Sequence, residues 1–419
     1  MHQTTFVPGR IQATTRASTI LPMDYATLLA DSRHMLPEIK SLRRSLHRIP
    51  EVGNHLPKTR AAVLEALDGL PLELHLHETT SGIAAVLDSG RPGSTIVLRG
   101  DMDGLAMPED TGLDFTSEHS GQMHACGHDL HTAMLVGAAR MLAGRKMEFS
   151  GKVLFMFQPG EEGHFGARYM LDEGLLDQVD PTPTRAFAIH VTSLHEAGSV
   201  HLKPGPYMAA ADKVAVTVHG KGGHASAPWN AVDPITVAAQ IVTAAEVALT
   251  RTVDVFDPAV LTFAQINAGT AYNVIPATAT LAGTTRTVSE ERRDQLHAMI
   301  EQVVSGVAAA NGVNATVEIE RGYPVTINDN DVAARVGTIA TDLVGEDHVV
   351  HAPTPIMGAE DWSYVLQKVP GVMVFLGSCP TDLEPGTAPV NHSNLVRFDE
   401  DSMAVGIALH SAVTLDYLT

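Results

Sequence analysis

The sequence predicts an α/β fold: a mixed, mostly parallel sheet flanked by helices, with a smaller unit inserted into it. Runs such as TIVLR (95–99), KVLFMF (152–157) and AFAI (186–189) are continuously apolar, which is typical of strands buried on both faces of a parallel sheet. These strands alternate with helical segments, as they do when helices cover both sides of such a sheet. Over residues 208–321 the order changes to βαββαβ, which is the order of a split-βαβ, ferredoxin-like unit.

The elements are expected in the following order along the chain. A Ser/Thr-rich leader over 1–20 is expected to be loosely ordered. The first part then carries helices over 25–46, 59–69 and 131–144, and strands over 82–88, 94–100, 152–158 and 185–191. The inserted unit carries strands over 213–220, 259–266, 277–287 and 314–322, and helices over 233–250 and 292–312. After it, helices resume with one further strand over 371–377. Residues 1–207 and 322–419 are therefore expected to form one discontinuous domain that receives 208–321 as an insertion.

Length and composition exclude several classes of protein. A chain of 419 residues suits two or three domains of about 100–200 residues each. It carries 28 Lys+Arg against 48 Asp+Glu, a net charge of -20, which argues against binding to nucleic acid or to an anionic membrane surface. No apolar run approaches the length of a membrane span, and the amino terminus lacks the continuous apolar region of a secretory signal. Two cysteines exclude a disulfide scaffold and favour a reducing cytoplasm.

Acidic and imidazole side chains follow several of the apolar strands. Asp101 and Asp103 follow one strand, Glu161 and Glu162 another, and AFAI ends at His190. A later loop reaches His392, and the cluster MHACGHDLH (123–131) immediately precedes a helix. Taken singly, each has a structural explanation: a hydrogen-bonded scaffold histidine, a solvated glutamate pair, a cap for the next element. Together at one edge of a sheet, where ligands bind in such folds, these groups repel one another unless a cation holds them.

Cys126 and His128 are the most informative pair. They are two residues apart and cannot share a helix face, where neighbours are three or four residues apart. They are therefore expected in the loop before the helix, with Gly127 permitting a tight turn. Thiolate, imidazole and carboxylate together suit zinc or another divalent transition metal better than magnesium or calcium. Cys379 is interpreted as a small buried apolar residue.

The adjacent glutamates 161 and 162 can divide two tasks if a metal is present. One carboxylate can bind the ion while its neighbour accepts a proton from water whose pKa the metal has lowered, and this arrangement is hydrolytic. Other catalytic patterns fail, since the chain has neither H-E-x-x-H nor G-x-S-x-G. GKGGHAS (220–226) lacks the spacing of a nucleotide-binding P-loop.

A set of ordered motifs over roughly residues 40–415 resembles the aminoacylase/carboxypeptidase family of dinuclear metallopeptidases. The resemblance is closest to its amidohydrolase branch, which includes hippurate hydrolase, N-acyl-amino-acid amidohydrolases and auxin-conjugate hydrolases. The motifs are LRGDMDGL, MHACGHDLHTAML, FQPGEEG, AIHV, GKGGHASAPWNAVDPI, NVIP, GTTRT, MGAEDWS and NHS. Two departures leave every ligand position intact: Ala106 stands where proline is common, and the last motif reads NHSN.

The resemblance implies a role for each matching residue. The implied metal ligands are Cys126, His128, Glu162, His190 and His392. Glu161 would be the general base, and Asp103 would orient a ligand. In the inserted unit, which dimerises and covers the active site in this family, His224 would polarise the scissile carbonyl, often across the dimer. Asn273 and Arg286 would contact the substrate's carboxylate. Without the resemblance, His224 could simply stabilise its loop, while Asn273 is more often a turn residue and Arg286 more often a surface ion-pair partner.

The sequence is thus interpreted as a cytoplasmic amidohydrolase that cleaves N-acyl-amino acids with two divalent ions per chain. Zinc or manganese is expected, cobalt or nickel is possible, and a homodimer or higher homo-oligomer through the inserted unit is implied by the resemblance. Neither nucleic acid nor membrane is expected as a partner. A dipeptidase or carboxypeptidase using the same site is the alternative enzyme. A metal-bound but non-catalytic binding or regulatory protein would require a lost base or ligand, yet all of these positions are filled.

Overall fold

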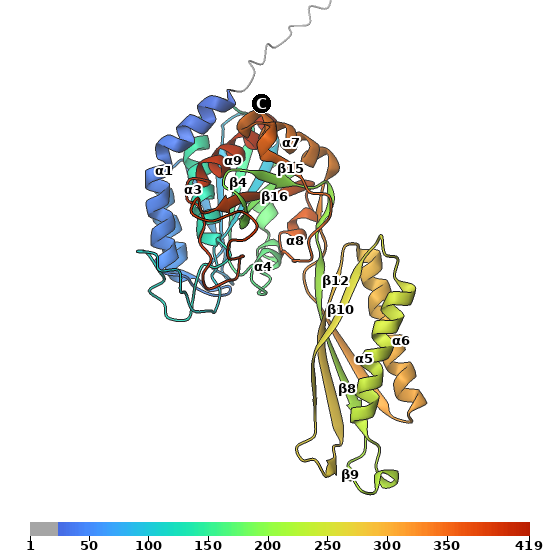
Figure 1. Cartoon of the computed structure of the whole chain (residues 1–419). Coiled ribbons are helices and arrows are strands. Elements are labelled where there is room, and N and C mark those ends of the chain that lie inside the picture. The colour runs from blue at the N-terminus through green and yellow to red at the C-terminus, as the bar shows by residue number, and fades with distance from the viewer. Residues whose placement is uncertain (1–23) are drawn as a thin grey trace, which may run out of the picture.

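A computed structural model describes residues 24–419, so the leader expected over 1–20 lies outside the described residues. The chain forms a larger lobe, in which helices surround a sheet, and an elongated smaller lobe with its own sheet (Figure 1). The two-stranded pair β7 (Gly205–Met208) and β14 (Thr326–Asn328) lies beside the two points where the chain passes between the lobes.

The larger lobe contains an eight-stranded sheet in the order β1-β2-β4-β3-β5-β16-β6-β15. The four central strands β4, β3, β5 and β16 are parallel neighbours, which confirms the predicted mostly parallel sheet. The three continuously apolar runs all lie in these central strands and are buried on both faces. Strand β2 pairs antiparallel with β4, and β1 antiparallel with β2 at the edge. The strands are β1 (Leu72–Leu76), β2 (Ile83–Asp88), β3 (Thr95–Asp101), β4 (Lys152–Gln158), β5 (Arg185–Glu196), β6 (Val200–Leu202), β15 (Val349–His351) and β16 (Gly371–Cys379).

Helices cover both faces of this sheet, as predicted. The helix α3 is buried along almost its whole length because it lies between the sheet and two further helices, α1 and α9. The opposite face is covered by shorter elements, whose packing buries the Trp362 side chain completely. The helices of the first face are α1 (Tyr25–Arg48), α2 (Pro57–Leu67), α3 (His128–Gly144), α7 (Asn330–Val344) and α9 (Met403–Leu418). Those of the second face are α4 (Gly166–Asp172), η1 (Leu175–Gln178) and α8 (Ser363–Leu366). The short turn η3 (Glu346–His348) precedes β15.

The smaller lobe has the predicted βαββαβ order and an antiparallel sheet in the order β10-β12-β8-β13. In β8 the residues Val214, Val216 and Val218 are buried while their neighbours are more exposed, because α5 and α6 cover only one face. The elements are β8 (Ala210–His219), α5 (Pro234–Thr252), β10 (Ala259–Ala268), β12 (Thr278–Thr287), α6 (Glu290–Ala310) and β13 (Asn314–Arg321). The tip of the lobe holds β9 (Gly223–His224), η2 (Pro228–Asn230) and β11 (Val274–Ile275) (Figure 1).

Within residues 24–419, no helix combines the length and the apolar character needed to cross a bilayer.

Candidate metal centre

The candidate residues gather at the carboxyl ends of the central parallel strands. Strand β3 ends at Asp101, and β4 is followed within four residues by Glu161 and Glu162. His190 lies within the longer strand β5, whose chain continues past the edge that the other strands reach. His392 lies in the loop after β16 and has a left-handed backbone, with φ of 70°. Because parallel strands end together, side chains from four distant parts of the sequence meet here.

The turn before α3 brings in two more side chains. Cys126 lies in the loop, as predicted, whereas His128 is the first residue of α3, which begins three residues earlier than expected. Gly127 between them has a φ of 87°, in the left-handed region that favours glycine. A Cβ atom at Gly127 would lie 2.3 Å from Cγ2 of Val191, so the turn can pass β5 only without a side chain.

Two groups of candidate ligands share one sulfur atom. Cys126, His128 and His190 form one group, and Cys126, Glu162 and His392 form the other, with the ligand atoms of each group within 4.8 Å of one another. The Cys126 Sγ atom lies 3.4 Å from Nε2 of His190 and 3.3 Å from Nε2 of His392. Two ligand atoms that each lie about 2.0–2.3 Å from one tetrahedral ion are separated from each other by about the distances found here. The geometry therefore fits two ions on either side of one thiolate.

The chemistry of the donor atoms also fits a cation. Nε2 of His128 is buried and has no hydrogen-bond partner among the described residues, and Oε1 of Glu162 lies 3.0 Å from Nε2 of His392. The Nδ1–H of His190 donates to its neighbour's carbonyl at 2.8 Å, which leaves Nε2 free to bind a metal. Hydrogen bonding to Cys126 and then to Glu162 raises the pKa of His392 to about 10. The cluster therefore favours a positive charge, which a divalent ion would supply.

Asp103 holds two parts of the site together. One of its carboxylate oxygens accepts a hydrogen bond from the Glu161 backbone at 3.0 Å, and the other accepts from the Glu162 backbone at 3.1 Å. Oδ1 of Asp103 also lies 3.3 Å from Nδ1 of His128. Asp103 therefore sets the direction of an imidazole and the course of the glutamate loop at once, although it is not in either ligand group.

Glu161 lies beside the candidate ligands without replacing one of them. Its side chain is buried, and Oε2 is 4.0 Å from Nε2 of His128. Burial, and then the nearby Glu360 carboxylate, raise the pKa of Glu161 well above that of an ordinary glutamate. A carboxylate with a raised pKa accepts a proton more readily near neutral pH, which suits a general base.

Sequence reasoning missed the buried ion cluster that supports this glutamate. The Arg99 guanidinium is fully buried and lies 2.8 Å from Asp101, 2.8 Å from Glu360 and 3.4 Å from Asp361. Burial by itself would raise the pKa of Asp101, but the nearby charge of Arg99 outweighs burial and lowers that pKa well below its usual value. An arginine at the end of an otherwise apolar strand was the one available signal, because a buried arginine needs carboxylate partners.

His131 was also given no role from the sequence. Its Nδ1 lies 2.6 Å from Asp101, and its Nε2 accepts a hydrogen bond from the Val191 backbone at 2.7 Å. It stands one helical turn after His128 and links α3 to both β3 and β5. His131 therefore helps to fix the strand segment that carries His190.

The three predicted residues of the inserted unit are not brought to this centre within one chain. His224 and Asn273 are exposed at the tip of the smaller lobe, where the Asn273 carbonyl accepts a hydrogen bond from Ala225. Figure 1 places this tip, marked by β9, at the end of the lobe farthest from the large sheet. Arg286 lies on β12 nearer the larger lobe, and its Nε–H donates to the carbonyl of Met357 at 3.2 Å.

Comparisons with known proteins agree with this architecture. The family model of peptidase family M20/M25/M40 matches residues 97–416. Thermostable carboxypeptidase 1 of Saccharolobus solfataricus is 34% identical over 391 residues, which cover 92% of this chain and 97% of that protein. An IAA-amino acid hydrolase of Arabidopsis thaliana is 33% identical, with 98% and 92% covered. The N-acetyl-L-cysteine deacetylase of Bacillus subtilis is 35% identical, with 81% and 80% covered.

The fold is likewise similar to that of solved structures. A crystal structure from Bacillus subtilis, described as a dinuclear metal-binding peptidase of family M20, superimposes with a TM-score of 0.79. It is 29% identical, and the match covers 92% of this chain and 99% of that one. With the family match over most of its length, the chain belongs to peptidase family M20/M25/M40 and is a hydrolase.

Proposed function

We propose that this protein is a metal-dependent amidohydrolase that cleaves N-acyl-amino acids to a carboxylic acid and a free amino acid. The observation that carries the proposal is the pair of ligand groups sharing Cys126, with the unused carboxylate of Glu161 beside them. Relatives named as an N-acetyl-L-cysteine deacetylase and an IAA-amino acid hydrolase support this class of substrate.

The proposal assigns two divalent ions to the five ligands Cys126, His128, Glu162, His190 and His392. A donor set of thiolate, imidazole and carboxylate suits zinc best among common ions, with manganese, cobalt or nickel also able to occupy it. When bound, such ions lower the pKa of water and polarise an amide carbonyl.

The residues of the chain then divide the remaining work. Glu161 accepts a proton as water adds to the acyl carbon, and it returns that proton to the amine nitrogen as the C–N bond breaks. Asp103 keeps His128 and the glutamate loop in place during both transfers. Burial, and then the nearby Glu360 carboxylate, raise the pKa of Glu161, which favours the first transfer.

A second copy of the chain would supply the residues of the inserted unit. The backbone and hydroxyl of Ser226 both donate to Nδ1 of His224, at 3.1 and 2.7 Å. The proton of the neutral ring therefore lies on Nε2, which can donate to a developing oxyanion. The Asn273 carbonyl accepts a hydrogen bond from the Ala225 backbone in the same tip. Arg286 would bind the substrate's carboxylate.

We infer a homodimer through residues 208–321, the inserted unit that we propose as a separate lid domain. Within residues 24–419 its edge strand β10 pairs with β12 on one side only, and Val260 and Ile266 on that strand are exposed. An open edge strand can pair with a second copy of itself. A cytoplasmic location is proposed because both cysteines are free and buried.

The direct test replaces Glu161 with Gln and measures both metal content and turnover. Turnover of N-acetyl and N-benzoyl amino acids should be lost while metal content is unchanged, because the amide keeps the shape and removes only the proton acceptor. Glu38→Gln, an exposed change on α1, serves as the control. Substantial activity in Glu161→Gln would exclude this glutamate as the base.

Carboxypeptidase activity is the second candidate, because a relative of similar identity carries that name. The two functions differ in whether the substrate has a free α-amine, which would require an acidic group to receive it. Dipeptides and matched N-acetyl dipeptides should therefore be compared in the presence of added zinc, manganese or cobalt. Faster cleavage of the free dipeptides would favour the carboxypeptidase.

The shared active site can be tested by mixing two inactive variants. Glu161→Gln lacks the base and His224→Ala lacks the donor, so neither should turn over alone. If His224 acts across the dimer, each mixed dimer has one complete site, and an equal mixture should recover about a quarter of wild-type activity. No recovery after verified subunit exchange would place His224 outside the partner's site.

A further inference from the structure

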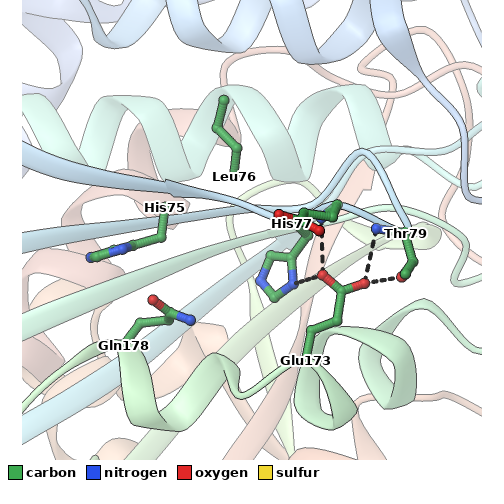
Figure 2. Close-up of a pocket in the computed structure, with 7 residues that line it drawn as sticks. His75, Leu76, His77, Thr79, Glu173 and Gln178 are labelled. Atoms are coloured by element: carbon green, nitrogen blue, oxygen red, sulfur yellow. Dashed lines mark hydrogen bonds and ion pairs between the residues drawn. The ribbon is translucent and has the colours of Figure 1, made fainter.

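A cavity of about 330 Å³ lies beside the edge strand β1, on the side of the large sheet covered by α4. Figure 2 shows His75 and His77 on the cavity side, with Gln178 and Glu173 facing them from η1 and the end of α4. Leu76 points the other way, as expected for alternating side chains of a strand. None of these residues belongs to the metal centre described above.

His77 is held as a metal-binding histidine usually is. Its ring is buried, and Nδ1 lies 3.1 Å from Oε2 of Glu173. The same carboxylate accepts hydrogen bonds from the backbone of Glu78 and Thr79, both at 3.0 Å, so its position is fixed. A hydrogen bond from Nδ1–H to a carboxylate leaves Nε2 as the lone-pair atom, the arrangement found behind ligating histidines.

The second ring nitrogen of His77 is unpartnered in the part of the chain that the structure describes. Its Nε2 atom is buried and makes no hydrogen bond with the described residues, an arrangement that buried polar atoms rarely adopt. Nε2 of His75 is likewise buried without a hydrogen bond. It lies 3.3 Å from the carboxylate of Glu73, which is the next residue on the same face of the strand. A carboxylate and two imidazoles, at positions 73, 75 and 77, thus follow one another at a spacing of two residues on one face of the chain.

We propose that His75 and His77 bind a divalent transition ion such as zinc in this cavity. Imidazole nitrogen and carboxylate oxygen are common ligands of zinc, and the Glu173 hydrogen bond orients His77 for that role. The His75 side chain is 28% exposed and points away from His77 in Figure 2, so it would turn toward His77 to share the ion. This inference is independent of the proposed amidohydrolase activity.

The ion count distinguishes a metal site from a purely structural role of these histidines. The holoenzyme is dialysed against buffered free zinc, and zinc per chain is measured for wild type, His75→Ala, Glu173→Gln and His34→Ala. His34 is an exposed histidine on α1 and serves as the matched control. Wild type and His34→Ala should bind one zinc ion more than His75→Ala. Glu173→Gln should bind that ion about 10–100-fold more weakly.

Melting temperature and hydrolysis of an N-acetyl amino acid are measured on the same samples. His75→Ala should keep its turnover, since the side chain is partly exposed and lies outside the active site, and its melting temperature should fall by no more than the loss of one bound ion explains. Equal zinc content in wild type and His75→Ala would overturn the proposal, as would an equal loss in His34→Ala. Either result would leave the proposed function untouched, because turnover is read separately.

Discussion

Replacing Arg99 with Met should strongly destabilise the larger lobe. The guanidinium is fully buried against three carboxylates that are themselves no more than 1% exposed. Removing it leaves three buried carboxyls without their guanidinium partner, and breaking a buried ion pair from one side costs about 3–5 kcal/mol. That loss is a large part of the roughly 5–15 kcal/mol by which a typical protein is folded.

The loss should depend on pH in a definite direction. In the wild type, Arg99 lowers the folded-state pKa of Asp101, so its stabilising effect is present above the unfolded pKa of about 3.9 and is lost as pH falls through the lower folded value. In the variant, the buried carboxyls that lose Arg99 should have higher folded pKa values than in the wild type, so protonation of the folded state is favoured. The deficit should therefore grow as pH rises from about 5 to 8.

Urea unfolding followed by tryptophan fluorescence can measure this effect. Trp362 is fully buried in the larger lobe, whereas Trp229 is 78% exposed in the smaller one, so a Trp229→Phe background makes the signal specific. Arg335→Met is the control, because the Arg335 side chain is 59% exposed and its ion pair with Asp416 should contribute about 0–1 kcal/mol. A loss below about 1 kcal/mol for Arg99→Met at pH 8, or a loss that grows toward acid pH, would refute this reasoning.

Three further changes test how the metal centre is built. Gly127→Ala should lower metal content and melting temperature through a left-handed backbone cost of about 1–2 kcal/mol and a clash with Val191. Gly144→Ala, at the last residue of α3, brings the new Cβ within 4 Å of no described atom and should be tolerated. Equal effects of the two substitutions would contradict the tight turn. Asp103→Asn should weaken metal binding about 10–100-fold in a zinc titration, and an unchanged affinity would show that Asp103 does not orient His128. Chelation should lower the melting temperature, and added zinc should restore it. A melting temperature that neither treatment changes would argue against bound metal.

The central part of the fold could be predicted because short stretches of consecutive residues indicate its strands. Three continuously apolar runs identified the parallel strands, and the change to alternating apolar and polar residues identified the second unit. Strand direction could not be read in the same way. GIAAVLD is as apolar as its neighbours but forms the antiparallel strand β2, because direction depends on the connection and not on composition. The edge strand β1 was missed, since LELHL is short and largely exposed.

The candidate site shows a similar division. Residues within one motif, such as Cys126 and His128, could be assigned from their spacing and from the resemblance to a family. Arg99 and Glu360 are 261 positions apart, so their ion pair exists only once the sheet has formed. The tip that carries His224 lies far from the metal centre in a single chain, and no local pattern indicates which copy of the chain it serves.

The shared thiolate of Cys126 is the central feature of the site, and metal content per chain tests it most directly. Mass spectrometry and a hydrolysis assay should compare wild type with Cys126→Ala and with Cys379→Ala, which removes the other buried cysteine. Because Cys126 belongs to both ligand groups, its loss should remove both ions and all turnover, while Cys379→Ala keeps both. A Cys126→Ala protein that retains two ions and hydrolyses N-acyl-amino acids would contradict this account.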